Sequence, residues 1–221
     1  MKSTPVTVTY YGHSCVLVEL SEDSGKPTRI LLDPGNLTPP LTEVSALDAV
    51  LVTHPHPDHL DPVQLQRLRS CTEGLSIYGV AGADAAAGDE IAVTEWSAGA
   101  HHLGEVEITA VETAHEVIYP GIPLPGNLGY LVGGRVFAPG DSFDAPDFEV
   151  DILLLPIGGP WMKLAEAIDF LIAVKPKVAI PVHDAGLAPA HRGLHRGLLT
   201  KFAPEGTQIV PLEAGDSRRF D

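Results

Sequence analysis

The chain of 221 residues has little cysteine and no long apolar run. Its only cysteines, Cys15 and Cys71, do not make a disulfide framework, so we expect two thiols in a reducing cytosol, although a bridge between them is left open. The opening MKSTPVTVTYYGHS lacks the apolar segment of a signal peptide, and no run approaches the roughly 18 apolar residues of a membrane span. These absences predict a cytoplasmic protein without a membrane partner.

Basic residues are also scarce. The chain has 14 Lys and Arg against 29 Asp and Glu, a formal net charge of −15 with neutral histidines. The acidic residues are spread along the chain, and such a surface repels a phosphate backbone, which argues against a nucleic-acid partner. The hydrophobic fraction of 44% is typical of a globular protein. The length and the absence of a linker predict one domain over residues 1–221.

Strands dominate the first part of the chain, and strands alternate with helices later. Asp61 followed by Pro62 predicts the start of a helix over 63–69, because Asp is a good N-cap and Pro fits the first helical position. Strands are predicted at 6–11, 15–20, 29–33, 49–53, 76–80, 105–112, 128–134, 135–140, 151–156, 177–182 and 207–212, and further helices at 81–88, 163–174 and 190–202. This order predicts a sheet-on-sheet core with helices outside.

Histidines and aspartates gather where predicted strands end. The stretch LVTHPHPDHLDP (51–62) places three histidines and two aspartates behind one strand. Asp33, His115, Asp141 and His183 each follow another strand. A single histidine after a strand is usually an ordinary loop residue, but loops at one rim of a sheet can aim several such groups at one point. Their repetition therefore predicts a site at that rim.

These residue types suit metal binding. Neutral imidazoles and carboxylates are ligands for Zn²⁺, Mn²⁺ or Fe, and a set without cysteine disfavours a purely structural zinc. His54 and His56, two apart, can face the same side of an extended segment. Asp58 and His59 join them only through a turn, so they suit a second metal. The two metals together need further ligands and a bridge, for which His115, Asp141 and His183 are the candidates. Two such metals lie about 3.5–4 Å apart.

The motifs THPHPDH, ETAHE, APGDS and IPVHDA resemble, in this order, those of the metallo-β-lactamase superfamily, and the resemblance spans essentially the whole chain. It implies an α/β fold, the four-layer αββα sandwich, with two divalent ions, zinc first and Mn²⁺ or Fe as alternatives. The implied ligands are His54, His56 and His115 for one ion, Asp58, His59 and His183 for the other, and Asp141 between them. Asp33, in LLDPG, matches a carboxylate that orients a ligand histidine.

Within that superfamily the segments YYGHSCVLVE, ILLDPG and GGPWMKLAEAIDFLIAVKPKVAIPVHD resemble small metal-dependent hydrolases that include L-ascorbate-6-phosphate lactonase. Other branches fit less well. The common β-lactamases carry Arg at the position of His59 and Cys at that of Asp141, and di-iron oxygen reductases usually carry Glu at that of His56. Glyoxalase II needs an added helical region, and the transfer-RNA endonucleases need an RNA-binding arm.

The resemblance implies a hydrolase that uses a metal-bound hydroxide to cleave an ester, lactone or phosphodiester bond in a small molecule. Asp58 would serve as a ligand and also orient the water or carry its proton. The alternative is a non-hydrolytic metal-binding or di-iron redox protein on the same fold. A homo-oligomer is left open.

Several other residues have two interpretations. His13 either contacts the substrate or supports a metal ligand from the pocket, or it is a plain buried histidine. Trp161 either lines the pocket or packs at a hinge. His101 and His102 are expected in a solvated loop. His191 and His195 have helical i, i+4 spacing, but no acidic partner completes a metal motif, so an exposed helix face is expected.

Overall fold

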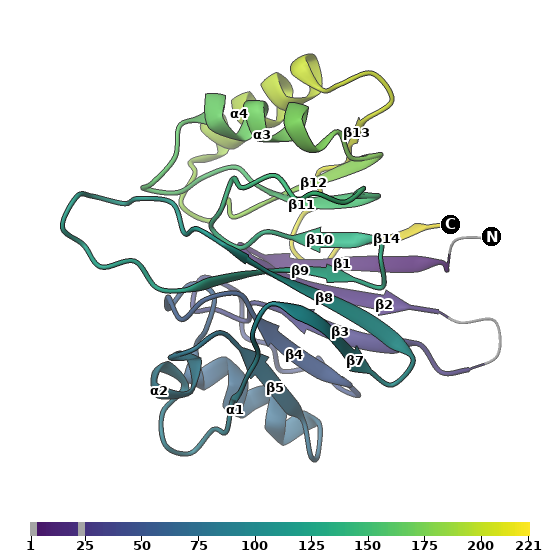
Figure 1. Cartoon of the computed structure of the whole chain (residues 1–221). Helices are drawn as coiled ribbons and strands as arrows, with labels where there is room; N and C mark the ends of the chain where they lie inside the picture. Colours follow the sequence, from purple (N-terminus) through teal and green to yellow (C-terminus); the bar gives the residue numbers. More distant parts are fainter. Residues whose placement is uncertain (1–3, 22–24) are drawn as a thin grey trace.

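The computed structural model describes residues 4–21 and 25–221. Two seven-stranded sheets pack face to face, and helices cover the outer face of each sheet (Figure 1). The predicted four-layer αββα sandwich is therefore confirmed. The first sheet has the order β14 (Ser217–Phe220), β1 (Val6–Gly12), β2 (Cys15–Leu20), β3 (Thr28–Leu32), β4 (Ala49–Val52), β5 (Ser76–Gly79) and β6 (Thr94–Glu95).

The second sheet has the order β13 (Gln208–Ile209), β12 (Val178–Val182), β11 (Ile152–Pro156), β10 (Val136–Ala138), β9 (Asn127–Val132), β8 (Val106–Thr113) and β7 (Gly99–Leu103). The helices α1 (Pro62–Cys71) and α2 (Ala83–Ala87) cover the first sheet, and α3 (Leu164–Val174) and α4 (Pro189–Phe202) cover the second (Figure 1). Both sheets are mixed: β3 to β6 and β10 to β13 are parallel, and the remaining neighbours are antiparallel.

Apolar strands supply two cores at once, because successive side chains of a strand point to opposite faces. In β4, Leu51 packs between the sheets while Val50 and Val52 pack under α1 and α2. In β11, Ile152 and Leu154 face the first sheet while Leu153 and Leu155 pack under α3 and α4. This double burial explains why these strands read as continuous apolar runs. Each buried strand ends at the edge of its sheet, so the polar residues that follow it lie at that edge.

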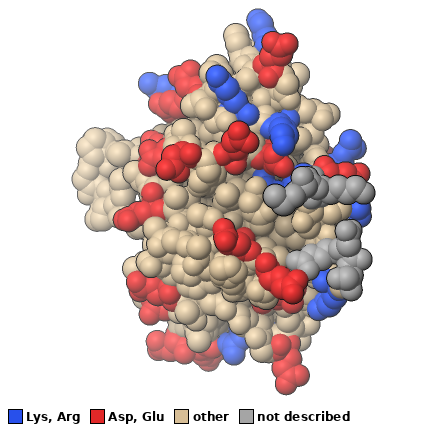
Figure 2. All heavy atoms as spheres, turned by 45° about the vertical axis from the view of Figure 1, so that its right-hand side comes forward, with Lys and Arg blue, Asp and Glu red and all other residues tan. Residues whose placement is uncertain are grey.

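The predicted start of α1 is confirmed. Asp61 is its N-cap and accepts a hydrogen bond from the Val63 N–H, and Pro62 opens the helix. The expectation of unpaired thiols is confirmed as well, with Cys15 buried and Cys71 exposed. None of the helices in residues 4–21 and 25–221 combines the length and apolar character that crossing a membrane requires. Figure 2 shows acidic side chains scattered over one face with basic ones among them.

Three expectations are wrong. His101 and His102 lie in β7 rather than in a loop, because Gly99–Leu103 pairs with β8 and the His101 ring stacks on Trp96, with ring centroids 4.1 Å apart. His195 is half-buried, because α4 packs over the segment after β11 and the His195 Nδ1 lies 2.7 Å from the Ile157 carbonyl oxygen. His191 is exposed, as expected. The last predicted strand shortens to β13, and the chain adds the unpredicted edge strands β6 and β14.

Candidate metal centre

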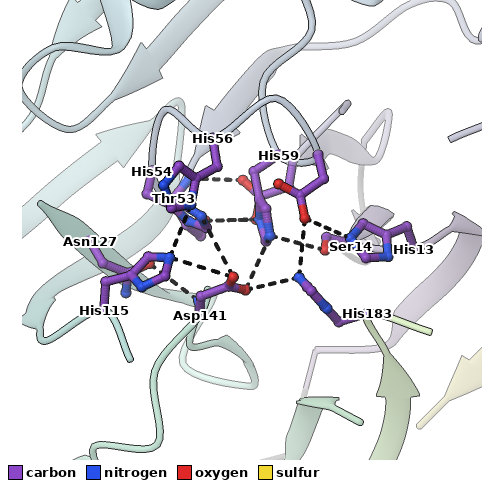
Figure 3. Close-up of polar contacts among 12 residues, drawn as sticks. His13, Ser14, Thr53, His54, His56, His59, His115, Asn127, Asp141 and His183 are labelled. Carbon is purple, nitrogen blue, oxygen red and sulfur yellow. Dashed lines mark hydrogen bonds and ion pairs between the residues drawn. The ribbon is translucent and has the colours of Figure 1, made fainter. Parts of the chain in front are cut away.

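The strand ends bring the histidines and aspartates of the sequence motifs together at one edge of the sandwich (Figure 3). The turn between β1 and β2 supplies His13, and the segment after β3 supplies Asp33. The remaining side chains follow β4, β8, β10 and β12, and they are His54, His56, Asp58, His59, His115, Asp141 and His183. Their potential ligand atoms form two compact groups, in each of which all of these atoms lie within 4.8 Å of one another.

The first group contains His54, His56, His115 and Asp141. His115 Nε2 lies 3.1 Å from His56 Nδ1 and 3.5 Å from Asp141 Oδ2, and His54 Nε2 lies 3.8 Å from the same oxygen. Two nitrogens bound to one tetrahedral zinc at ordinary bond lengths are about 3.3 Å apart. The spacing of the His56 and His115 nitrogens is therefore close to that of two ligands of one ion.

The second group contains His13, Asp58, His59 and His183. His183 Nε2 lies 3.4 Å from Asp58 Oδ2. The other carboxylate oxygen of Asp141, Oδ1, lies 3.1 Å from His59 Nε2 and 3.2 Å from His183 Nε2. Asp141 thus turns Oδ2 to the first group and Oδ1 to the second, which is the arrangement of a carboxylate placed between two ions.

Three of the imidazoles are held through the nitrogen that faces away from the centre. His59 Nδ1 lies 2.9 Å from Asp33 Oδ2, His115 Nδ1 donates to the Glu116 carbonyl over 2.7 Å, and His183 Nδ1 donates to the Gly158 carbonyl. A proton held on Nδ1 leaves a lone pair on Nε2. These contacts therefore set both the orientation and the tautomer that a metal ligand needs.

Asp33 is held as firmly as the histidine that it contacts. Its Oδ1 accepts from the Thr53 N–H and its Oδ2 from the Thr53 hydroxyl, each over 2.8 Å. Its backbone lies in the left-handed region with φ of 46°. His13 and His183 also have positive φ, and such strain in residues with a Cβ concentrates at functional sites.

The segment after β3 also supports the histidine-rich loop through Gly35. A Cβ on Gly35 would lie 1.9 Å from the Asp58 carbonyl oxygen, so only glycine permits this close approach. The Asn36 N–H donates to the Pro57 carbonyl over 2.8 Å, and this joins the two segments. The loop that carries Asp58 is therefore packed against a rigid neighbour.

His13 and Trp161, left open by the sequence, both contact carboxylates of the centre. His13 Nε2 lies 3.1 Å from Asp58 Oδ2, while its Nδ1 accepts from the Ala185 N–H over 3.4 Å, so His13 is the donor to Asp58. The Trp161 indole donates to Asp141 Oδ2 over 2.7 Å. Asn127 was not among the residues predicted for the site, yet its Oδ1 accepts from the Asp141 N–H over 3.3 Å.

The imidazoles and carboxylates of the centre shift one another's pKa values. Burial lowers the pKa of His54 well below its usual value. Burial also opposes charge on His59 and His183, but the nearby carboxylates outweigh it: Asp141 and Asp33 raise the pKa of His59, and Asp141 and Asp58 raise that of His183 to about 9. Burial raises the pKa values of Asp58 and Asp141, but the surrounding histidines lower them by more, so both lie well below the usual range.

Three buried atoms of the centre make no hydrogen bond of acceptable geometry among the described residues: His54 Nε2, His183 Nε2 and Asp141 Oδ1. The last two lie within ion-pair distance of each other, but distance alone does not satisfy them. An unsatisfied buried polar atom costs about 1–3 kcal/mol, and such atoms are rare in native proteins. Nitrogen and oxygen lone pairs aimed into a shared space fit divalent metal ions, which would also replace the protons on His59 and His183.

Comparisons with known proteins agree with this geometry. A family model described as a β-lactamase superfamily domain matches residues 7–183. A Mycobacterium tuberculosis protein is 37% identical over 218 residues, covering 94% of this chain and 97% of its own length. An Archaeoglobus fulgidus protein named UPF0173 metal-dependent hydrolase is 34% identical over 207 residues, covering 80% of this chain and 82% of its own length.

Solved structures share the fold. The metallo hydrolase Igni18 from Ignicoccus hospitalis superposes with a TM-score of 0.73 at 20% identity, covering 99% of both chains. The di-iron β-hydroxylase CmlA from Streptomyces venezuelae gives a TM-score of 0.69 at 18% identity, covering all of this chain and 54% of CmlA. At such identities these likenesses show the fold alone. The likeness to L-ascorbate-6-phosphate lactonase stays a prediction. By its family match and its relatives, the chain belongs to the β-lactamase superfamily and, within it, to the UPF0173 metal-dependent hydrolases.

Proposed function

We propose that this protein hydrolyses an ester, lactone or phosphodiester bond in a small cytoplasmic molecule, with metal ions held by the two groups described above. The observation that carries the proposal is the placement of Asp141, which turns one carboxylate oxygen to each group. Two divalent ions, zinc first and Mn²⁺ or Fe as alternatives, would lower the pKa of bound water to about 7 and polarise the substrate oxygen.

We assign His54, His56 and His115 to one ion and Asp58, His59 and His183 to the other, with Asp141 between them. Five of these seven side chains are buried, whereas His56 and Asp58 are partly exposed. Buried ligands held through their outer nitrogens keep their geometry while substrates exchange. The partly exposed pair lies where a substrate can reach the centre.

Asp58 is the residue to which we assign proton handling. Its side chain is 27% exposed, against 3% for Asp141, so it is the carboxylate of the centre that water and substrate can approach. The His13 N–H fixes its Oδ2, which leaves Oδ1 to orient a water molecule or accept its proton. Asp33 and Trp161 act on this chemistry only through the ligands that they hold.

Metal content and hydrolysis measured on the same preparations test the assignment. His54→Ala removes a buried ligand, whereas His191→Ala changes an exposed histidine of α4. We expect loss of metal and of hydrolysis on a panel of esters, lactones and phosphodiesters for His54→Ala only. Equal metal content in both variants would overturn the assigned site.

The alternative is a di-iron redox protein, since CmlA shares the fold. It predicts bound iron that cycles between oxidation states and a protein inert to every ester in the panel. That result, obtained with the metal-loaded wild-type protein, would replace the hydrolase proposal.

A further inference from the structure

A pocket of about 250 Å³ opens beside the second group. His13, Asp58 and His183 form its inner wall, so a molecule in the pocket touches the candidate centre directly. The segments after β3, β11 and β12 form the remaining walls. The volume lies below the roughly 300–1,000 Å³ of pockets for drug-sized ligands, and it suits one part of a small substrate.

The outer walls of the pocket are apolar. Leu37, Pro160 and Leu187 supply the side chains, and glycines 158, 159 and 186 supply the rest. A Cβ on Gly158 would lie 2.8 Å from Leu187 Cγ, so glycine is what lets the Leu187 side chain pack against this wall. Leu37 is 48% exposed and therefore meets solvent until something covers it.

Cations do not line this pocket. Among its nine described lining residues none is Lys or Arg. Arg192 and Arg196, on the helix that follows the Gly186–Leu187 wall, point to Asp184 at 3.8 and 3.3 Å. The Ala185 N–H donates to His13 and the Leu187 N–H to Asp184, so two backbone donors of that wall are also used. Sites for phosphate usually offer Arg, Lys or free N–H groups.

A segment outside the lining of this pocket, 117–126, is also apolar. The segment 117–126 begins two residues after His115, ends before Asn127, and projects from the same end of the sandwich (Figure 1). It contains no charged residue, and Val117, Tyr119, Ile122 and Leu124 are exposed on it. With no Lys or Arg among the described lining residues and a net charge of −15, the approach to the centre offers an anionic group no cationic side chain and accepts apolar groups.

We infer that the substrates are uncharged carboxylic esters or lactones whose acyl part is a short apolar group, and that Leu37 and Leu187 select it. The inference rests on the proposed hydrolase function. Water adds its oxygen to the carbonyl carbon, the ester C–O bond breaks, and the alcohol oxygen gains a proton. The other product is a carboxylic acid that ionises at neutral pH.

Two substrates with the same reacting bond test the charge preference. 4-Nitrophenyl butyrate and mono(4-nitrophenyl) succinate differ chiefly in the terminal carboxylate of the acyl chain. On the zinc-loaded protein we expect kcat/KM for the butyrate to exceed that for the succinate at least tenfold. Leu37→Lys should shrink this ratio at least threefold, whereas Ile172→Lys, at an exposed position of α3, should leave it unchanged.

The outcomes separate the two proposals. Two results would overturn the substrate class but leave the proposed hydrolase function intact. One is an equal or higher kcat/KM for the succinate, and the other is cleavage of bis(4-nitrophenyl) phosphate without cleavage of either carboxylic ester. Failure of the metal-loaded protein to cleave any of the three substrates would count against the hydrolase itself. A ratio unchanged in folded Leu37→Lys would overturn the role of the pocket wall.

Discussion

Trp161 donates its indole N–H to Oδ2 of Asp141 over 2.7 Å, and this oxygen is the one that faces His54 and His115. Both side chains are buried. The Asp141 backbone N–H meanwhile donates to Asn127 Oδ1. One hydrogen bond thus orients the carboxylate, and the other holds the backbone that carries it. A group oriented in advance loses less entropy when it becomes a ligand.

Trp161→Phe should lower zinc affinity about tenfold, the lower end of the loss typical when a partner of a metal ligand is removed. Phenylalanine keeps much of the ring packing and removes the N–H. Competition against a chromophoric chelator measures the change. Trp96→Phe makes the same substitution in the aromatic stack between Tyr78 and His101, and it should leave the affinity unchanged. Equal affinities in the two variants would mean that the indole contact does not position Asp141.

Asp33→Asn should reduce bound zinc from two ions per chain towards one. The asparagine side chain keeps the shape of Asp33, but its NH₂ group would donate to His59 Nδ1 and move the imidazole proton to Nε2, where a lone pair is needed. Elemental analysis after gel filtration measures the stoichiometry. Asp61→Asn is the matched control, because asparagine caps a helix about as well as aspartate. Two ions retained in Asp33→Asn would contradict the orienting role.

The sequence allowed the site residues to be located because each follows a strand. A strand such as β4 or β12 is recognisable from its own apolar run. Because neighbouring strands run parallel, the residues that follow their carboxyl ends lie at the same edge of the sheet. That shared edge predicts that residues such as His54 and Asp141 gather in one region. The assignment of individual ligands came from the resemblance, since spacing alone does not divide seven residues between two ions.

The sequence did not reveal features that depend on a distant partner. The strand β14 carries two arginines and becomes a strand only because it pairs with β1, more than 200 residues away. His101 is ordered by stacking on Trp96, and the bond from Trp161 to Asp141 joins two loops. Local patterns contain no signal for such contacts, because the energy of each comes from a surface that forms only in the folded chain.

Removing the metal should lower the melting temperature. Ions that bind only the folded state stabilise it by about 2.7 kcal/mol when free metal exceeds the dissociation constant a hundredfold. For a chain of this size that corresponds to a shift of about 5–10 °C. Differential scanning fluorimetry with and without EDTA measures the shift, and added zinc should restore it. His54→Ala should show a smaller shift than the wild type, and a wild-type melting temperature indifferent to EDTA would contradict metal binding.

Asp151→Asn should destabilise the protein at neutral pH by about 1 kcal/mol. Asp151 Oδ2 accepts from Arg135 Nε over 3.1 Å and its Oδ1 from Lys177 Nζ over 2.6 Å. Burial raises the pKa of this carboxyl, but the two cations outweigh burial and the pKa falls below its usual value. A depressed folded pKa means that the stabilisation is present above the unfolded pKa of about 3.9 and disappears as the pH falls through the folded value.

Urea denaturation of wild type and Asp151→Asn, both with EDTA so that metal release does not contribute, measures this difference at pH 7 and at pH 3. The difference in unfolding free energy should be smaller at pH 3, because protonation removes the charge that the asparagine lacks at every pH. Asp169→Asn, at an exposed position of α3, should show a smaller difference at both values. A difference for Asp151→Asn that is the same at pH 7 and pH 3 would assign its role to shape and hydrogen bonding rather than to charge.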